Sequence, residues 1–272
     1  MKKLIFGKGK VSNIVKNNED IVLDRKSCDI TDYSQVLKSI QESKAEIILN
    51  CAAKTNLEYC QEEKQESFNS NVLGVLNVLR ACSELDKKII HISSGCLFDG
   101  NSFISDEKTI PSPAVWYTWT KKWADELIEN FGYSNYLILR PRQLISRVPH
   151  KSNMLTKFAS MNKIPAIDEP NSITCIEDFS EMIDHLVRVD ATGIYNCCNT
   201  GLLSPYEIAI EVKKSLNSKL EVEKASYEKL LTIMPNRRVN TILSCDKLIS
   251  TGYEPRDAKD ALLWCLKNYD KT

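Results

Sequence analysis

The stretch "KLIFGKGKVS", Lys3–Ser12, decides the fold. An apolar run ends at two glycines, Gly7 and Gly9, and apolar residues then recur at helical spacing. A glycine turn between a strand and a helix is typical of pyrophosphate sites, because glycine allows both a tight turn and a close approach of the backbone. Gly7 and Gly9 fit the first two glycines of G-x-G-x-x-G. The third position is Ser12, which predicts looser packing of helix on strand, and an ordinary glycine turn is the alternative interpretation.

Outward from this stretch, short apolar runs alternate with amphipathic stretches. The runs are "KLIF", "DIVLD", "AEIILNCAA", "KKIIHISS" and "NYLILRPR". The stretches between them include "SQVLKSIQES", "NVLGVLNVLRACSE" and "WYTWTKKWADELIENF". Strand and helix periods that take turns predict βαβ units and a buried parallel sheet. We therefore predict an α/β fold, a Rossmann-type doubly wound parallel sheet with a small C-terminal lobe.

The second half of the chain is less regular. It is broken by prolines, with one short helix predicted around Met154–Met161. "DFSEMIDHLVRV" and "TGIYNCCN" predict one more helix and strand, and "SPYEIAIEVKKSL" predicts a helix capped by Ser204. We expect residues 1–144 to form a dinucleotide-binding domain and 145–272 mainly the lobe, with about 172–197 returning to the sheet.

Composition excludes several classes of protein. The 272 residues carry 36 positive and 36 negative side chains, which gives no electrostatic reason for binding nucleic acid or an anionic membrane. No apolar run is long enough to cross a bilayer, and the start is too short for a signal peptide. Ten cysteines occur without a CxxC pattern, so we expect reduced thiols in a cytoplasmic protein and no metal site.

Charged residues at the end of the second strand bear on coenzyme choice. Asp24 stands where an acid usually takes the ribose hydroxyls of a dinucleotide. Arg25 and Lys26 follow at once and can hold a 2′-phosphate. We therefore predict NADPH as coenzyme, with NADH possible. Solvated surface charge is the alternative interpretation of both residues.

A tyrosine and a lysine four residues apart suggest the reacting group. Tyr117 and Lys121 share one face of a predicted helix. An ammonium near a phenol favours the phenolate and lowers its pKa, which equips a tyrosine for proton transfer near neutral pH. Ser94 ends the preceding predicted strand and supplies a third polar group for such a reaction. The alternative is that Tyr117 and Lys121 are two ordinary surface residues.

A thiol follows that serine in "IHISSGCLFDG", Ile90–Gly100. Residues two apart in an extended segment point to the same side, so we expect Ser94 and Cys96 to face one cavity. The hydroxyl and the thiol would then serve two reactions on one substrate. A buried structural thiol is the competing interpretation.

Together these motifs resemble the extended short-chain dehydrogenase/reductases that reduce 4-keto-6-deoxy nucleotide sugars. "GKGKVS" matches the coenzyme loop, with Lys10 and Val11 beside the glycines. "CDITD" resembles the adenine-contacting segment through Asp29 and Ile30. "NCAAKTN" matches the family's segment beside the coenzyme, here Cys51, Ala52 and Ala53. "NSNVLGVLNVL" matches the family's helix and places Asn71 on the asparagine that has a structural and proton-relay role. "SSGCLFDG" is similar to "STDYVFDG" of dTDP-4-dehydrorhamnose reductases, with Gly95-Cys96 replacing Asp-Tyr.

That replacement resembles a narrower group, the plant and giant-virus nucleotide-rhamnose 3,5-epimerase/4-reductases, which carry Thr-Gly-Cys there. "LRPRQLIS" followed by "NMLTK" resembles their segment that ends in a lysine, here Lys157. "DEPNSITCIEDFS" and "NLEYCQ" also have counterparts in that group. In that group the cysteine and the lysine carry epimerisation. The reduced glycine loop, the short first helix and Trp116 depart from the group's pattern.

The resemblance implies an NADPH-dependent 4-reductase, bifunctional with 3,5-epimerase activity, that makes UDP- or dTDP-L-rhamnose or a similar 6-deoxy-L-sugar. Two alternatives stay open: a 4-reductase alone, acting for instance on a 2-acetamido sugar nucleotide, and a non-catalytic coenzyme-binding regulatory subunit. A homodimer is typical of the superfamily. The implied catalytic residues are Ser94, Tyr117, Lys121, Cys96, Lys157 and Asn71. Tyr117 and Lys121 also contact the coenzyme, and the implied substrate contacts are Lys54, Thr55, Arg142, Gln143 and Arg238, the last with surface charge as its alternative.

Overall fold

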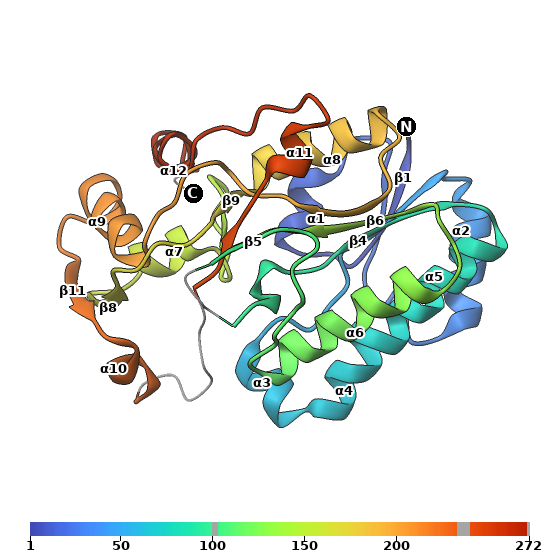
Figure 1. The fold of residues 1–272 in the computed structure, drawn as a ribbon, viewed down its shortest axis with the longest axis horizontal. Coiled ribbons are helices and arrows are strands. Elements are labelled where there is room, and N and C mark those ends of the chain that lie inside the picture. The colour runs from blue at the N-terminus through green and yellow to red at the C-terminus, as the bar shows by residue number, and fades with distance from the viewer. Residues whose placement is uncertain (100–102, 233–239, 271–272) are drawn as a thin grey trace.

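A computed structural model describes residues 1–99, 103–232 and 240–270. Its centre is a six-stranded sheet in the order β10-β6-β4-β3-β1-β2, and every neighbouring pair of strands is parallel (Figure 1). The strands are β1 Lys3–Phe6, β2 Ile21–Leu23, β3 Ile47–Asn50, β4 Lys88–Ile92, β6 Tyr136–Arg140 and β10 Gly193–Asn196. The strand order reverses at β1, which has β2 on one side and β3 on the other. The predicted doubly wound parallel sheet is confirmed, and ligands bind at such a switch point.

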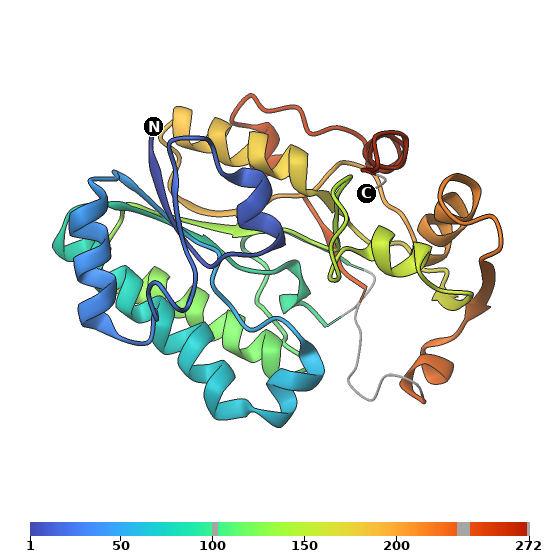
Figure 2. The same cartoon turned by 180° about the vertical axis from the view of Figure 1, so that it is seen from behind.

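Helices cover both faces of this sheet (Figures 1 and 2). One face packs against α2 Tyr33–Ser43, α5 Gly74–Glu84 and α6 Trp116–Asn130, and the other against α1 Lys10–Val15, α8 Ile176–Arg188 and α11 Asp246–Ile249. Alternation along β1 shows the division, because Leu4 and Phe6 join the first core and Ile5 joins the second. All three side chains are fully buried. The strand runs read from the sequence therefore form the centre of two apolar layers.

The small lobe has its own apolar core. It is built from α7 Met154–Ala159, β8 Lys163–Ile167, α9 Pro205–Ser215, β11 Glu221–Ala225 and α12 Ala258–Lys267. The predicted cap of α9 is confirmed, because the Ser204 hydroxyl accepts a hydrogen bond from the Glu207 backbone N–H at 3.0 Å. Strand β8 was not predicted, since its Pro165 argues against a strand. Proline is tolerated here because β8 pairs with β11 alone and does not need the missing N–H for a second neighbour.

Short elements complete the fold between these strands and helices. They are α3 Leu57–Glu62, α4 Lys64–Phe68, the π-helical turn η1 Asn69–Leu73, the 3₁₀ turn η2 Gly95–Leu97, β5 Ile104–Ser105, β7 Leu144–Ile145, β9 Thr174–Cys175, α10 Tyr227–Leu231 and β12 Ile242–Leu243. Two of the pairings, β7 with β9 and β5 with β12, are parallel. Within the described ranges, no helix has the length and apolar character needed to cross a membrane.

Candidate active site

The glycine loop is shaped by close contact with the end of β3. Gly7 has a φ of +94°, and a Cβ there would lie 2.6 Å from the backbone of Ala52, so only glycine fits. Gly9 has an extended backbone, and nothing lies within 4 Å of where its Cβ would be. Gly7 therefore allows the loop to pack against the backbone after β3, and Gly9 leaves open space beside the loop. Ser12 is buried rather than loosely packed, and its hydroxyl accepts a hydrogen bond from the Gly9 N–H at 2.7 Å.

Beside this loop is a cavity of about 470 Å³, which we call the glycine-loop cavity. Eight of the residues predicted to bind the coenzyme line it: Gly7, Asp24, Arg25, Lys26, Asp29, Ile30, Ala52 and Ala53. Gly9, Lys10, Val11 and Cys51 were predicted with them but do not line it. Burial raises the pKa of Cys51 to about 12, so this thiol stays protonated at neutral pH.

Ion pairs surround the mouth of the glycine-loop cavity. The Arg25 guanidinium contacts Asp29 at 3.2 Å and Glu66 at 2.8 Å. The same Glu66 carboxylate pairs with Lys54 at 2.7 Å and accepts a hydrogen bond from Tyr59. Lys54, Tyr59 and Arg25 together lower the pKa of Glu66 to about 2. Glu66 was not predicted, because it stands in a run of charges, "QEEKQESF", that looks like solvated helix surface.

Two predicted substrate residues do not lie where we expected. Lys54 lines the glycine-loop cavity and not the lobe cavity, and its role as a sugar contact stays a prediction. Thr55 lines neither of the two cavities described here. Asp24 does lie at the end of β2, and its carboxylate accepts hydrogen bonds from the backbone of Lys26 and Ser27 at 3.0 and 2.9 Å. Bonds from the Ser27 backbone and hydroxyl are the main cause of its lowered pKa.

Tyr117 and Lys121 lie on one face of α6, but they do not affect each other as predicted. Burial raises the pKa of Tyr117, nearby Cys96 raises it further, and only a hydrogen bond from Ser94 and the charge of Arg142 oppose this. Lys121 instead donates to the Ile92 carbonyl at 2.7 Å and lies 3.1 Å from His91 Nε2. Burial lowers its pKa to about 8. The predicted lowering of the tyrosine pKa by Lys121 is therefore wrong, because desolvation of the phenol outweighs every charge near it.

Asn71 lies in the π-helical turn η1 and is fully buried. Its amide donates to the Lys54 carbonyl at 2.9 Å and to the Thr120 hydroxyl at 3.0 Å, and its oxygen accepts from the Lys54 N–H at 2.7 Å. The side chain therefore fixes the chain after β3 to α6, one residue before Lys121. π-Helical turns often mark functional sites.

The loop after β4 separates Ser94 from Cys96. The chain stops being extended at Ser94 and enters η2, where the Ser94 hydroxyl accepts a hydrogen bond from the Cys96 N–H at 3.1 Å. Of these two residues, Cys96 lines the second cavity and Ser94 does not, while Ser94 acts on Tyr117. A cavity that both side chains face stays a prediction. Glycine at position 95 is favoured for a steric reason, because a Cβ there would lie 2.7 Å from Leu243 Cδ1.

The second cavity, of about 600 Å³, lies at the lobe and is called the lobe cavity. Its lining is mostly apolar, but it brings together Cys96, Arg142, Gln143 and Lys157 from three separate stretches of sequence. Arg142 donates to the Cys96 sulphur at 3.0 Å. Met154 and Phe158 also line this cavity and were not predicted, because apolar residues at helical spacing look like ordinary core. Arg238 lies outside the described residues.

Gln143 has an unusual backbone for its residue type. Its φ is +44°, a left-handed conformation that carries strain in a residue other than glycine and that often marks a functional site. Its amide nitrogen lies 3.3 Å from the Met154 sulphur. Within the part of the chain that the structure describes, its buried side-chain oxygen has no hydrogen-bond partner. An unpaired acceptor in a cavity wall is a group that a ligand can satisfy.

Lys10 links the glycine loop to the entrance of the lobe. Its ammonium donates to the carbonyls of Ser152 at 3.2 Å and Leu144 at 3.4 Å. Burial and then the charge of Lys157 lower its pKa to about 8, while Glu177 acts in the opposite direction. The loop that borders one cavity is thus tied to the segment that leads to the other.

Comparison with known proteins gives this fold and site a family. The model of the RmlD substrate binding domain matches residues 7–271, so the chain belongs to that family. It is 26% identical to a bifunctional dTDP-4-dehydrorhamnose 3,5-epimerase/dTDP-4-dehydrorhamnose reductase of Arabidopsis thaliana over 86% of this chain and 80% of that one. The crystal structure of the L780 UDP-rhamnose synthase from Acanthamoeba polyphaga mimivirus superimposes with a TM-score of 0.86 at 26% identity, covering 98% of this chain and 99% of that one. A dTDP-4-dehydrorhamnose reductase from Bacillus anthracis, solved in complex with NADP, shares the fold with a TM-score of 0.90 at 24% identity and 98% coverage of both chains.

Proposed function

We propose that this protein reduces the 4-keto group of a nucleotide-linked 6-deoxyhexose with NADPH, and that it also epimerises C3 and C5 of that sugar. The product would be a 6-deoxy-L-sugar nucleotide such as UDP- or dTDP-L-rhamnose. One observation carries this proposal: Cys96 and Lys157, which are far apart in sequence, line one cavity next to the Ser94–Tyr117 pair. The epimerase and reductase activities named for the Arabidopsis relative support it, as does the UDP-rhamnose synthase activity named for the mimivirus protein.

The residues of the glycine-loop cavity fit a dinucleotide. The open space beside Gly9 would admit a pyrophosphate, and Asp24 borders the cavity with an acceptor for a ribose. Arg25 and Lys26 border the same cavity and would hold a 2′-phosphate. Bound NADPH supplies the hydride. We propose that Gly7, Lys10, Val11, Asp29, Ile30, Cys51, Ala52 and Ala53 complete its binding site.

In the reduction, one proton must reach the oxygen on C4 as the hydride reaches C4 itself. Tyr117 would donate that proton, since its raised pKa keeps the phenol protonated until an alkoxide forms beside it. Ser94, which hydrogen-bonds to the phenol, would also hold the C4 oxygen. Lys121 would bind the nicotinamide ribose, and Asn71 would keep the chain after β3 in place beside α6.

In the epimerisation, the C4 ketone acidifies the protons on C3 and C5. One group removes a proton from one face of the ring, and a second group returns a proton to the other face. Cys96 and Lys157 are a thiol and an amine in the wall of one cavity, and each can take either role. Arg142 holds the Cys96 sulphur in place, and the free oxygen of Gln143 would accept a hydrogen bond from a sugar hydroxyl.

The division of labour follows the two cavities. Residues 1–144, with about 172–197, would carry the coenzyme, and the rest of 145–272 would carry the sugar nucleotide. Incubation of the purified chain with candidate 4-keto-6-deoxy sugar nucleotides and NADPH, followed by mass spectrometry and NMR of the product, tests this. Consumption of NADPH with formation of a 6-deoxy-L-sugar is expected. Coenzyme binding without turnover of any candidate would instead favour a regulatory subunit.

A further inference from the structure

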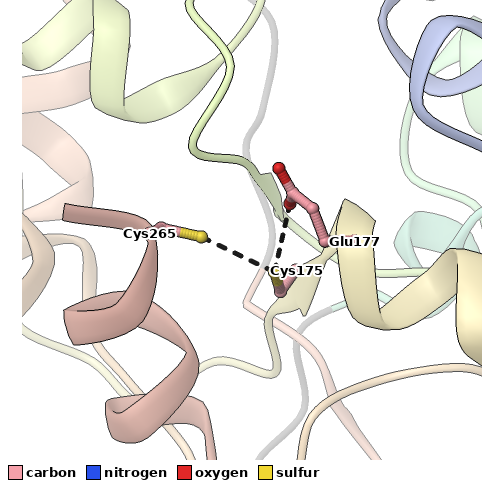
Figure 3. Close-up of side chains that lie close together, drawn as sticks. All are labelled: Cys175, Glu177 and Cys265. Carbon is pink, nitrogen blue, oxygen red and sulfur yellow. Dashed lines mark hydrogen bonds between the residues drawn. The ribbon is translucent and has the colours of Figure 1, made fainter. Parts of the chain in front are cut away.

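Two buried cysteines that are far apart in sequence meet a glutamate where the lobe joins the sheet. Cys175 ends β9, Glu177 lies in the first turn of α8, and Cys265 comes from α12 (Figure 3). Both cysteines are fully buried. The Cys175 sulphur lies 3.5 Å from the Cys265 sulphur and 3.2 Å from a Glu177 carboxylate oxygen, and one donor atom from each residue lies within 4.8 Å of the others.

These distances are too long for a disulfide and close to those of a metal site. A disulfide holds its sulphurs about 2.05 Å apart. A tetrahedral Zn²⁺ with bonds of about 2.3 Å to sulphur and about 2.0 Å to oxygen sets its sulphurs about 3.8 Å apart and sulphur and oxygen about 3.5 Å apart. The two distances from the Cys175 sulphur, 3.5 and 3.2 Å, each differ from that geometry by a few tenths of an ångström.

The surroundings orient the three donors. The Ser146 hydroxyl and the Arg147 N–H bind the other carboxylate oxygen of Glu177, at 2.8 and 3.2 Å, and leave the first oxygen directed at Cys175. The Cys175 N–H donates to the Asn199 side chain at 2.7 Å, which fixes the backbone at the start of α8. Groups that hold ligands from behind in this way are typical of metal centres.

We propose that Cys175, Glu177 and Cys265 form a binding site for a thiophilic divalent cation of the Zn²⁺ class. Two thiolates and a carboxylate suit such an ion, because soft sulphur ligands select zinc and similar metals over magnesium or calcium. The three protein ligands leave one tetrahedral position for a solvent molecule. The bound ion would join α12 to the start of α8, which covers the sheet. Among the described residues this is the one group of three potential ligands so arranged.

The sequence pattern does not predict this site, because Cys175 and Cys265 are 90 residues apart. A second thiol contact offers a matched control. The Cys245 thiol donates to the Cys198 carbonyl at 3.4 Å in another part of the protein, without the third ligand of the proposed site. Substitution of Cys245 therefore removes one buried thiol and leaves the proposed ligands intact.

Titration of the reduced full-length chain with Co²⁺ alone tests the site. We expect binding of one Co²⁺ per chain, with sulphur-to-cobalt absorption in the near ultraviolet. This absorption should disappear when Zn²⁺ displaces the Co²⁺. Cys175→Ser and Cys265→Ser would lose this absorption, and Cys245→Ser would keep it. Glu177→Gln retains both thiols and would weaken Co²⁺ binding by at least about tenfold.

Several results would overturn the site. They are the absence of stoichiometric Co²⁺ binding by the wild-type chain, absorption that persists in Cys265→Ser, and unchanged affinity in Glu177→Gln. Because Glu177→Gln retains both cysteines, it still tests the site if a cysteine variant fails to fold. Mass spectrometry that finds a Cys175–Cys265 disulfide in the chain purified under reducing conditions would also count against a metal.

Discussion

The glycine-loop cavity and the lobe cavity are built in different ways from the same chain. Most of the first comes from segments that directly follow β1, β2 and β3, so three adjacent strand ends place its residues together. The second takes Cys96 from the loop after β4, Arg142 and Gln143 from the segment after β6, and Lys157 from α7. The first cavity is rimmed by charges, whereas the second is mostly apolar with a few polar groups. The residues of a cavity at strand ends can be predicted from the fold class, whereas those of a cavity formed by a lobe cannot.

The largest effect is expected at Tyr117, which lies near Cys96 of the lobe cavity. Tyr117→Phe removes the proposed proton donor and keeps the ring. We expect the rate of 4-keto-sugar reduction to fall by ~10²–10⁴-fold, the usual contribution of one proton-transfer group. NADPH binding, measured by fluorescence titration, should be retained, because the ring is kept and the residues of the glycine-loop cavity are unchanged. Near wild-type reduction by this variant would rule out Tyr117 as the donor.

The next effect belongs to the lobe cavity alone. Cys96→Ser keeps the size of the side chain and removes most of its acid/base competence. We expect incorporation of solvent deuterium at C3 or C5 to fall by ~10²-fold, while a substrate that is already epimerised is still reduced. Mass spectrometry of the sugar recovered from D₂O measures both. Lys157→Met should show a related defect, and Lys151→Met, an exposed lysine on the preceding loop, should not.

Exchange at the wild-type rate in Cys96→Ser would show that the thiol is structural. The protein would then be a plain 4-reductase, and epimerisation would belong to another protein. Because reduction of the epimerised sugar is measured in the same variant, this outcome is distinct from a general loss of activity.

A smaller effect is expected in the glycine-loop cavity. Changing Arg25 and Lys26 together to alanine should weaken NADPH binding by ~10–100-fold, since charge-assisted hydrogen bonds contribute about 1.5–3 kcal/mol. We expect the lower end of that range, because Arg25 is already held by Asp29 and Glu66, and a 2′-phosphate must compete with them. NADH binding should stay the same. Calorimetric titration with both coenzymes measures the difference.

A matched control removes two lysines from the lobe. Lys213 and Lys214 lie in the last turn of α9, and their replacement by alanine changes the net charge equally without touching the cavity. If the wild-type chain binds NADH more tightly than NADPH, the 2′-phosphate interpretation is wrong and Asp24 makes the dominant contact.

The same contrast explains what could be predicted from the sequence. Strand and helix periods were enough for the six strands and for the glycine loop, because burial imposes those periods locally. The contacts of Glu66, Lys54 and Gln143 could not be predicted, since they depend on tertiary pairing and on a left-handed backbone at a residue that is not glycine. Strand β8 was hidden by Pro165, which only its place in a two-stranded sheet makes acceptable.

The pKa of Tyr117 shows why chemistry is harder to predict than fold. A YxxxK pattern gives the spacing of a phenol and an ammonium but not the burial of either. In the structure desolvation acts on both groups, raising the pKa of Tyr117 and lowering that of Lys121 to about 8. Lys121 directs its charge to the Ile92 carbonyl at the end of β4. Its buried charge has a cost to stability that can be measured.

The smallest effect concerns that cost. An unfolded chain holds a lysine with a pKa of about 10.4, whereas burial lowers the pKa of Lys121 to about 8 in the folded protein. Between these values the unfolded chain binds more protons, so this residue makes the free energy of unfolding rise with pH. In Lys121→Met the contribution is absent. We therefore expect the stability of the wild-type protein relative to this variant to rise by about 1 kcal/mol from pH 8 to pH 9, measured by urea unfolding of both at each pH. Other titrating groups cancel in the difference, and a difference that stays constant over this range would mean that Lys121 keeps its ordinary pKa and is solvated in the folded protein.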